Sequence, residues 1–314
     1  GAQSKPAAAP ASARTNVVPM QQEMLMLIDG SNLLSRAYFA TSHGGPQSLM
    51  RTSDGRYTNA VYGMVQSFFG LLKRFKPTHV AIMWDVSRSS SHRRVYYPAY
   101  KGTRGETDPA LKEQFETARE MFEMMCAPQF TVPTMEADDL IGTAAVRWAK
   151  DKGLPCYIIS NDKDLHQLID AQTSQLMYRK GGDVLYTEAD FEAEYGIKTS
   201  QWVDAKALLG DTSDNIPGVS GVGDKAVFPM LQQFGSIEGI YQDLSALEPN
   251  FKRYIKKLEA GKDNAFLSKQ LATIVTDTKG LTDDWEQFRI QMSKKGMLEA
   301  FRKLEFDSLL ERIS

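Results

Sequence analysis

Short apolar runs in the first half of the chain have the length of buried β-strands. Three of these runs, each followed by an aspartate within three residues, lie at 24–28, 79–84 and 155–159. Helix-like stretches separate them, including an amphipathic pattern at 58–75, so we predict an α/β fold with a central, mostly parallel sheet flanked by helices. In such sheets, ligands bind at the carboxyl ends of the strands. We therefore expect Asp29, Asp85 and Asp162 to share a site.

The pattern changes after the third run. Residues 176–178 and 184–186 indicate a small hairpin, and helical patterns dominate 196–314. Residues 1–22 are rich in Ala, Pro and Ser and lack the apolar stretch of a secretory signal, so we interpret them as a flexible tail or linker. The predicted organisation is an α/β domain at 23–195 followed by a helical domain.

Composition narrows the class of protein. Of the 314 residues, 42% are apolar and 24% are charged, as in soluble globular proteins. Cys126 and Cys156 have no metal-type spacing and suggest no disulfide framework, which fits a reducing cytoplasm, and no apolar run is long enough to span a membrane. The formal net charge is −2, but setting aside nine acids that we group as one site leaves −2 + 9 = +7. With those nine acids neutralised by cations, the remaining surface suits a polyanion.

The nine acids occur in short segments. Besides the three aspartates at strand ends, they are Glu136, Asp138, Asp139, Asp164, Asp211 and Asp214. The last two are three residues apart, which places both on one face of a helical turn. Asp29 could simply cap a helix, and the acids at 136–139 could complement a helix dipole. However, three acids in four residues between apolar positions are too much unpaired charge to bury, and divalent metal is the usual counter-charge.

A glycine-rich stretch follows the last of these acids. Residues 216–225 contain glycines at 218, 221 and 223. This spacing favours a tight hairpin between two helices, with backbone N–H groups free to meet phosphates. An ordinary glycine-rich loop is the alternative, and the acids just before the stretch favour the hairpin.

A basic segment at 88–119 precedes the acids at 136–139. It combines seven arginines and lysines with interleaved tyrosines, a mixture that suits backbone contacts and base stacking on single strands. Gly102 and Gly105 argue against a plain packed helix in its first half. A solvated loop and helix is the alternative interpretation.

Taken together, these segments resemble the bacterial 5′-3′ exonucleases and the 5′ nuclease domain of DNA polymerase I, relatives of the flap endonucleases. The resemblance covers residues 24–313 and is supported by FLSKQLATI at 266–274. Six motifs carry it in order: LIDGSN at Asp29, WD at Asp85, YPAYKGTR at 97–104, EADDLIGT at 136–143, SNDKDL at 160–165 and LLGDTSDNIPGVSGVGDK at 208–225. Each motif alone is weak, whereas six in this order are specific. The resemblance implies a PIN-like fold with a helical arch at about 86–120 and a helix-hairpin-helix motif at about 205–235.

The family also implies two groups of acids that bind two divalent ions. By resemblance, the group nearer the scissile phosphate comprises Asp29, Asp85, Glu136 and Asp138. The remaining group comprises Asp139, Asp162, Asp164, Asp211 and Asp214. The ions, Mg²⁺ or Mn²⁺, would activate water and stabilise charge on the phosphate, and hard oxygen ligands suit Mg²⁺. The implied reaction is phosphodiester hydrolysis at 5′ flaps and 5′ ends of DNA, in primer removal, replication and repair.

Contacts with DNA follow from the same resemblance. Lys101 and Arg104 resemble a basic pair at the base of the arch that contacts the scissile phosphate, and the hairpin resembles one that grips duplex backbone, commonly with a bound K⁺. The expected DNA-contacting residues are Arg93, Arg94, Tyr97, Tyr100, Lys101, Arg104, Gly218, Val219, Gly221, Gly223 and Lys225. We expect a monomer that acts on flap, nicked or branched DNA, with RNA-primed DNA as a further candidate substrate.

Two departures from the family pattern and two alternatives remain. Pro229 would fall inside the helix after the hairpin at a cost of about 3 kcal/mol, so we expect that helix to start later or to kink. Residues 87–93 carry serines where a Thr-Phe-Arg pattern is common, which we interpret as variation.

The alternatives are a PIN or RNase H type ribonuclease, which lacks the hairpin and arch, and a non-catalytic DNA-binding protein, in which some acids should be missing. The absence of polymerase motifs after Ser314 favours a stand-alone enzyme.

Overall fold

A six-stranded sheet forms the centre of the molecule. The computed structural model describes residues 22–313, so the predicted tail lies outside the described residues apart from Gln22. The strands are β1 (Leu25–Asp29), β2 (His79–Met83), β3 (Gln129–Phe130), β4 (Cys156–Ile159), β5 (Thr173–Arg179) and β6 (Gly182–Tyr186). Their order across the sheet is β3-β2-β1-β4-β5-β6, and all neighbours are parallel except β5 and β6.

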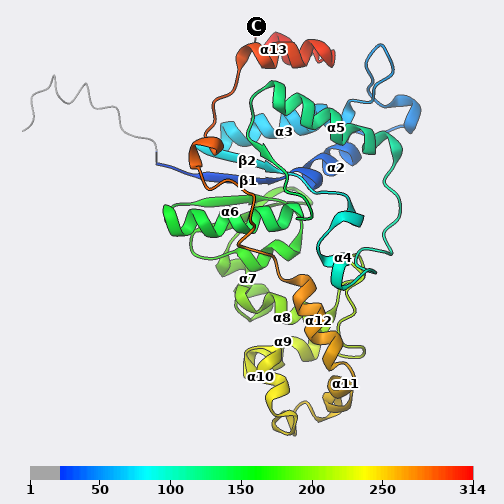
Figure 1. Cartoon of the computed structure of the whole chain (residues 1–314), viewed down its shortest axis with the longest axis vertical. Helices are drawn as coiled ribbons and strands as arrows, with labels where there is room; N and C mark the ends of the chain where they lie inside the picture. Colours follow the sequence, from blue (N-terminus) through cyan, green and yellow to red (C-terminus); the bar gives the residue numbers. More distant parts are fainter. Residues whose placement is uncertain (1–21, 314) are drawn as a thin grey trace, which may run out of the picture.

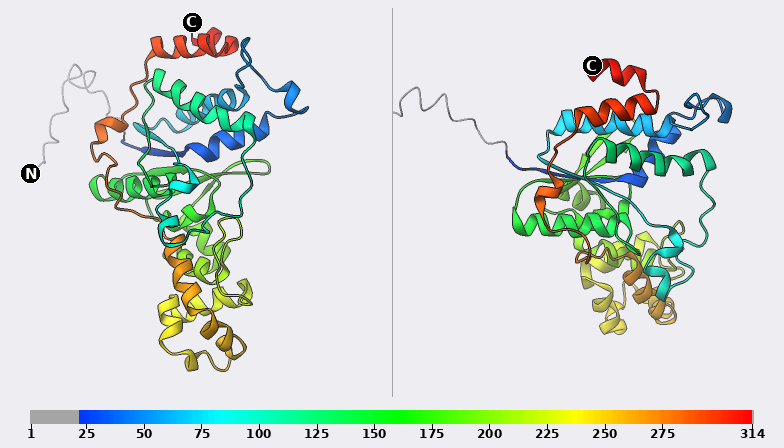
Figure 2. Two further views of the ribbon diagram at one scale, coloured as in Figure 1. Left: turned by 45° about the vertical axis from the view of Figure 1, so that its right-hand side comes forward. Right: turned by 45° about the horizontal axis from the view of Figure 1, so that its top comes forward.

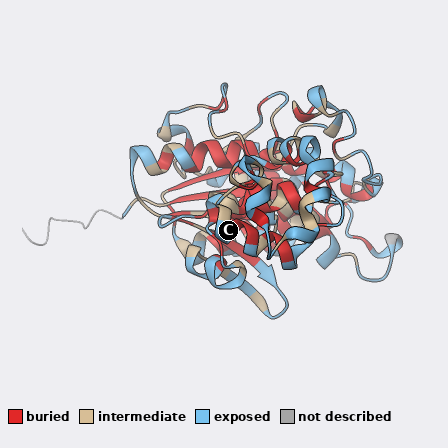
Figure 3. Cartoon of the chain, turned by 90° about the horizontal axis from the view of Figure 1, so that it is seen from below, coloured by how far each residue is buried: buried red, intermediate tan, exposed pale blue. Residues whose placement is uncertain are grey.

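Both faces of the sheet are buried because helices cover each of them. Met26 and Ile28 of β1 pack into one apolar cluster, whereas Leu25 and Leu27 pack into another on the opposite face. This alternation follows from the two-residue period of a strand and explains why β1 reads as a continuous apolar run. Figure 3 shows the buried residues concentrated in the strands and on the inward faces of the helices.

Helices from distant parts of the chain cover the first face. They are α2 (Gly30–Ala40), α3 (Asn59–Phe75), α5 (Pro109–Met124), α13 (Lys294–Lys303) and α14 (Asp307–Ile313). The opposite face is covered by α6 (Ala137–Asp151), as Figure 1 shows. The short helix α4 (Arg93–Tyr96) lies apart from both layers, and the chain runs from it along the outside of the molecule to α5.

A second group of helices extends away from the sheet (Figures 1 and 2). Its elements are α7 (Glu188–Tyr195), α8 (Trp202–Leu209), α9 (Asp224–Phe234), α10 (Ile237–Gln242), α11 (Ile255–Ala260) and α12 (Lys262–Ala272). These helices enclose an apolar cluster of their own that includes Trp202, Val227 and Leu258. We refer to this group as the helical region.

Most of the predicted architecture is present, with three differences. The α/β fold, the three strands that precede acids and the β5–β6 hairpin are confirmed, whereas the two-residue strand β3 is too short to leave a periodic signal. The helices α13 and α14, which we expected in the helical domain, pack with α3 and α5 because Phe301 and Leu309 complete the cluster on that face.

Pro229 is the third difference. Helix α9 starts directly after Gly223 and is continuous across the proline, so the later start that we allowed for is excluded, whereas the alternative, a kink, stays a prediction. Pro229 lies on the exposed side of the helix, where water can satisfy the carbonyl that loses its partner. In the part of the chain that the structure describes, no helix is both long and apolar enough to cross a membrane.

Candidate active site

The carboxylates that the sequence singled out gather at the carboxyl ends of the strands. Asp29 is the last residue of β1 and also caps α2, accepting a hydrogen bond from the Asn32 amide at 3.3 Å, so the capping alternative is realised together with the clustering. Asp85 follows β2, and Asp162 follows β4. Their carboxylates interact electrostatically, as do those of Asp138 and Asp164, so one region of charge includes all of them.

The carboxylates of four of these acids form no ion pair within the part of the chain that the structure describes. Among residues 22–313, no Lys, Arg or His forms an ion pair with Asp29, Asp85, Asp138 or Asp162. The neutral contacts that hold them are short: the Ser160 hydroxyl donates to Asp29 at 2.8 Å, and the Ala137 amide donates to Asp85 at 2.8 Å. We refer to these four residues as the unpaired acids.

Desolvation and repulsion from neighbouring carboxylates hold Asp29 and Asp138 in a high-energy state. Burial, together with the charges of Asp85 and Asp162, raises the pKa of Asp29 to about 7. Burial also raises the pKa of Asp138 well above its usual range, and the charges of Asp162 and Asp29 add to this effect. A buried carboxylate without a counter-charge is costly, so the group calls for positive charge from outside the chain.

The arrangement fits divalent metal ions. One oxygen each from Asp29, Asp138 and Asp162 lies within 4.8 Å of the others, close enough for a single ion to contact all three. Asp164, Asp211 and Asp214 form a second group by the same measure. Carboxylate oxygens are the ligands that hard divalent cations prefer, and no cysteine takes part.

The other five acids form ion pairs with basic side chains of the chain itself, although Lys206 is shared by two of them and the pKa of Asp164 stays raised, to about 7, by burial and by the charge of Asp162. Lys206 lies 3.3 Å from Asp164 and 3.2 Å from Asp211, and Arg104 pairs with Asp214. The remaining two, Glu136 and Asp139, pair with residues of the basic segment. Sequence reasoning missed Lys206, although its position in the last turn of α8, just before Asp211, was a usable signal.

Lys101 and Arg104 lie directly on the acids. The Lys101 ammonium donates to Glu136 at 2.6 Å, and its backbone amide donates to the Asp214 carbonyl at 2.8 Å. Lys101 has a positive φ of 56°, a conformation that is costly for a residue with a side chain and that these contacts hold in place. Arg104 also donates to the Ser213 carbonyl at 3.0 Å and keeps about a third of its side chain exposed. The predicted basic pair therefore lies at the rim of the acid cluster.

Of four residues expected to contact DNA, two are buried and two are half-buried, and all four make contacts within the chain. Arg93 and Tyr100 are only 3% and 4% exposed, so neither side chain is open to DNA in this structure. The Tyr100 hydroxyl donates to Glu136 at 3.1 Å, while Arg94 donates to the Tyr100 carbonyl and Tyr97 to the Asn215 carbonyl. Aromatic and basic composition did not separate these internal contacts from a DNA-binding surface, because both use the same residue types.

The glycine-rich stretch forms a tight turn between α8 and α9. Gly218 adopts a positive φ of 62° and is buried with Val219, whose amide donates to the Leu208 carbonyl at 2.8 Å. The Gly218 amide donates to the Ser268 hydroxyl of α12 at 2.9 Å, so α12 supports the turn from behind. Of the hairpin residues expected to contact DNA, Gly221, Gly223 and Lys225 are exposed. These three are therefore available to a ligand.

Comparisons with known proteins agree with this geometry. Residues 24–196 match the family model of the 5′-3′ exonuclease N-terminal resolvase-like domain, and residues 197–296 match that of the 5′-3′ exonuclease C-terminal SAM fold. A 5′-3′ exonuclease of Halalkalibacterium halodurans is 49% identical over 264 residues, which cover 84% of this chain and 87% of that protein. DNA polymerase I of Bacillus subtilis is 37% identical over 93% of this chain, which spans only 32% of the polymerase.

A solved structure shows the same fold. The bacteriophage T5 D15 flap endonuclease, in a complex with DNA and metal ions, matches with a TM-score of 0.63 and 23% identity. The match covers 93% of this chain and 98% of the phage protein. The family models account for nearly the whole described chain, and the acids of the site lie within them. The chain therefore belongs to the 5′-3′ exonuclease family of nucleases.

Proposed function

We propose that the chain is a structure-selective 5′ nuclease that hydrolyses phosphodiester bonds at 5′ flaps and 5′ ends of DNA with two divalent metal ions. The observation that carries this proposal is the group of four unpaired acids beside a rim of basic side chains. The acids suit cations, and the rim suits the phosphate that those cations would share. The named relatives, a 5′-3′ exonuclease and a flap endonuclease complexed with DNA and metal ions, support the same reaction.

The metal ions we propose are Mg²⁺ or Mn²⁺. When bound, they supply an activated water and positive charge at the phosphate. Asp29, Asp138 and Asp162 would hold one ion, with Asp85 close by. An ion at the second group would compete with Lys206 and Arg104 for the same carboxylates. We therefore expect the second group to bind its ion more weakly than the first.

The chain's own residues would bind and orient the DNA. Lys101 and Arg104 lie at the rim of the acid cluster, with side chains 17% and 36% exposed, so they would leave their carboxylates to hold the scissile phosphate. The exposed end of the hairpin, with Lys225, would bind duplex backbone, and K⁺ is our candidate for a further ligand there. We assign the nuclease domain to 23–195, with α13 and α14 packed on the first face of its sheet. We assign the arch to about 86–120, of which the part in α5 also covers that face, and the duplex-binding motif to about 205–235.

The biological setting follows from the substrate. We place the enzyme in primer removal, replication and repair, acting as a monomer on flap, nicked or RNA-primed DNA. Cys126 and Cys156 are both free thiols, which fits a reducing cytoplasm.

The test is cleavage of a 5′-labelled flap duplex, with a second flap whose 5′ end is blocked, in Mg²⁺ and in EDTA. We expect a short labelled product in Mg²⁺ alone, no product from Asp138→Asn, and normal cleavage by Asp263→Asn, which changes an exposed aspartate of α12. Loss of cleavage on blocking the 5′ end would indicate that the strand threads through the arch. Flap binding without cleavage in Mg²⁺ or Mn²⁺ would support the non-catalytic alternative.

A further inference from the structure

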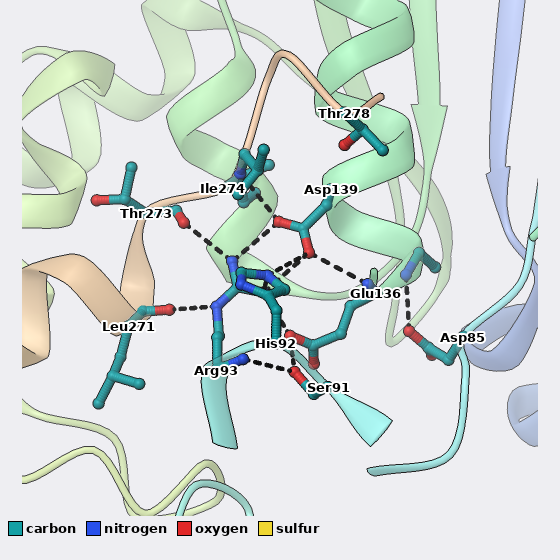
Figure 4. A network of polar contacts seen from close by, with 12 residues as sticks. Asp85, Ser91, His92, Arg93, Glu136, Asp139, Leu271, Thr273, Ile274 and Thr278 are labelled. Carbon is teal, nitrogen blue, oxygen red and sulfur yellow. Dashed lines mark hydrogen bonds and ion pairs between the residues drawn. The ribbon is translucent and has the colours of Figure 1, made fainter. Parts of the chain in front are cut away.

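Arg93 lies at the centre of a polar network that joins three distant segments (Figure 4). An arginine has five N–H donors, and here they meet oxygens on every side. Its Nε donates to the Leu271 carbonyl at 2.8 Å, and Nη2 donates to the Thr273 carbonyl at 2.9 Å. The two Nη atoms also donate to both oxygens of Asp139 at 2.9 Å, and Nη1 donates to Glu136. A side chain so fully engaged and buried cannot reach a substrate.

Asp139 is the main hydrogen-bond acceptor and ion-pair partner of this guanidinium. Its carboxylate is fully buried and also accepts from the Val275 amide at 2.9 Å and from the Glu136 amide at 3.1 Å. Burial alone would raise the pKa of Asp139, but hydrogen bonds from His92 and Arg93 and the guanidinium charge outweigh it and lower that pKa. We expected Asp139 to bind metal, whereas its oxygens face Arg93 and backbone amides. Its neighbour Asp138 faces the unpaired acids instead.

The segment that Arg93 holds is the exit from the helical region. Residues 271–275 comprise the last two residues of α12 and the chain that follows, and they lie against α6, where a Cβ on Gly142 would lie 2.5 Å from the Ile274 side chain. The Thr143 hydroxyl donates to the Val275 carbonyl at 3.2 Å. Because α12 also supports the hairpin through Ser268, a continuous series of contacts runs from the hairpin through α12 and Arg93 to Glu136.

Glu136 is where this series reaches the site. One of its oxygens accepts from Arg93, and the other accepts from Lys101 and Tyr100. Burial opposes ionisation, but the charges of Lys101 and Arg93 outweigh it and lower the pKa of Glu136. When Lys101 leaves for a phosphate, Arg93 still neutralises the buried carboxylate. Without Arg93, Lys101 would be its only cation, and its departure would leave a buried charge unpaired.

We propose that Arg93 is a positioning residue that holds Glu136, frees Lys101 to bind phosphate, and couples the helical region to the acid cluster. Asp139 is the ion-pair partner of Arg93 and not a metal ligand. This inference rests on the proposed function, because its effect on activity is expressed through a nuclease site. Its other consequences, for metal affinity and for coupling between sites, do not require cleavage.

The experiment compares Arg93→Lys with Arg147→Lys. Arg147 is a matched control because it donates from α6 to the Leu281 and Thr278 carbonyls at 2.9 and 3.0 Å and has no carboxylate partner among the described residues. On a 5′ flap in Mg²⁺, we expect Arg93→Lys to lower kcat by about 30-fold with KM changed less than about threefold, as when about 2 kcal/mol of transition-state stabilisation is lost. We expect Arg147→Lys to change neither. An equal loss of kcat in the two variants would show that Arg93 only stabilises the fold, and would overturn its positioning role.

Calorimetry with Mn²⁺ supplies the readout that needs no cleavage. A closed dumbbell duplex without a 5′ end should raise the Mn²⁺ affinity of the unmodified protein about fivefold, a typical coupling between sites, and should not raise that of Arg93→Lys. The same gain in both proteins would overturn the coupling. A protein that binds Mn²⁺ with this coupling but cleaves no flap would contradict the proposed function and leave the role of Arg93 intact.

Asp139→Asn tests the role of Asp139 separately and remains informative if Arg93→Lys fails to fold. We expect this variant to bind the same number of Mn²⁺ ions as the unmodified protein, with kcat reduced in the manner of Arg93→Lys. Loss of one bound Mn²⁺ ion would show that Asp139 is a metal ligand and would overturn the proposal.

Discussion

Neutralising Asp29 should stabilise the metal-free protein while abolishing its activity. The carboxyl group has an unfolded pKa near 3.8, and burial with the charges of Asp85 and Asp162 raises its folded pKa to about 7. An acid whose folded pKa is raised favours folding only while it is protonated, so stability falls as the pH rises from 3.8 to about 7 and stays low above that. At about 1.4 kcal/mol for each pH unit, ionised Asp29 costs about 4 kcal/mol at pH 8.

The substitution Asp29→Asn removes this cost and keeps the local structure. An asparagine oxygen can still accept from the Asn32 amide, so the cap of α2 is retained. Because the repulsion is shared with neighbouring acids, we expect a gain of about 2–4 kcal/mol at pH 8. The cost of ionising Asp29 accumulates from its unfolded pKa of 3.8 up to the working pH. At pH 5 this interval is short, so the gain in stability from Asp29→Asn should fall below about 2 kcal/mol.

The assay is equilibrium unfolding in urea with EDTA at both pH values. Asp263→Asn, at an exposed site, should show no gain at either pH. In saturating Mg²⁺ at pH 8 the advantage of Asp29→Asn should shrink, because only the unmodified protein retains a complete site for the stabilising ion. A destabilisation of Asp29→Asn in EDTA, equal at pH 5 and pH 8, would refute the view that the acid is held against repulsion.

Three further changes follow from the same contacts. Asp138→Asn should abolish flap cleavage while flap binding, measured by fluorescence anisotropy, stays within about threefold; normal cleavage would remove Asp138 from the site. Lys206→Met should destabilise the metal-free protein by about 2 kcal/mol, because two partly buried acids lose their cation, and Mg²⁺ should recover most of that loss in urea unfolding. Gly142→Ala should cost about 2 kcal/mol through its contact with Ile274, whereas Gly70→Ala, with open space around its Cβ position, should be neutral or stabilising; equal effects in thermal unfolding would contradict the close approach.

The sequence was informative wherever a local pattern carries the structure. Apolar runs ending in Asp29 and Asp85 predicted both the strands and the shared edge of the sheet, because parallel strands bring their carboxyl ends together. The glycines at 218 and 221 predicted the tight turn, since both adopt positive φ values of 62° and 82°. These features depend on neighbours in the sequence or on the common direction of the strands.

Local sequence patterns did not predict which acids pair with cations and which remain unpaired. Adjacent residues Asp138 and Asp139 have the same chemistry, but one faces the unpaired acids and the other faces Arg93. That difference depends on the rotation of α6 and on residues 271–275, which lie more than 130 positions further along the chain. The burial of Arg93 could not be predicted for the same reason. Its partners Asp139 and Leu271 are far apart in the sequence and come together only in the folded chain.

The central claim is that the unpaired acids hold the catalytic metal. A crystal of the protein soaked in Mn²⁺ tests it directly, since the anomalous signal locates the ion without assumptions about activity. We expect a strong peak among Asp29, Asp138 and Asp162, with a second, weaker peak near Asp164, Asp211 and Asp214. A peak beside Asp139 and His92 in place of Arg93, with none among the unpaired acids, would contradict it.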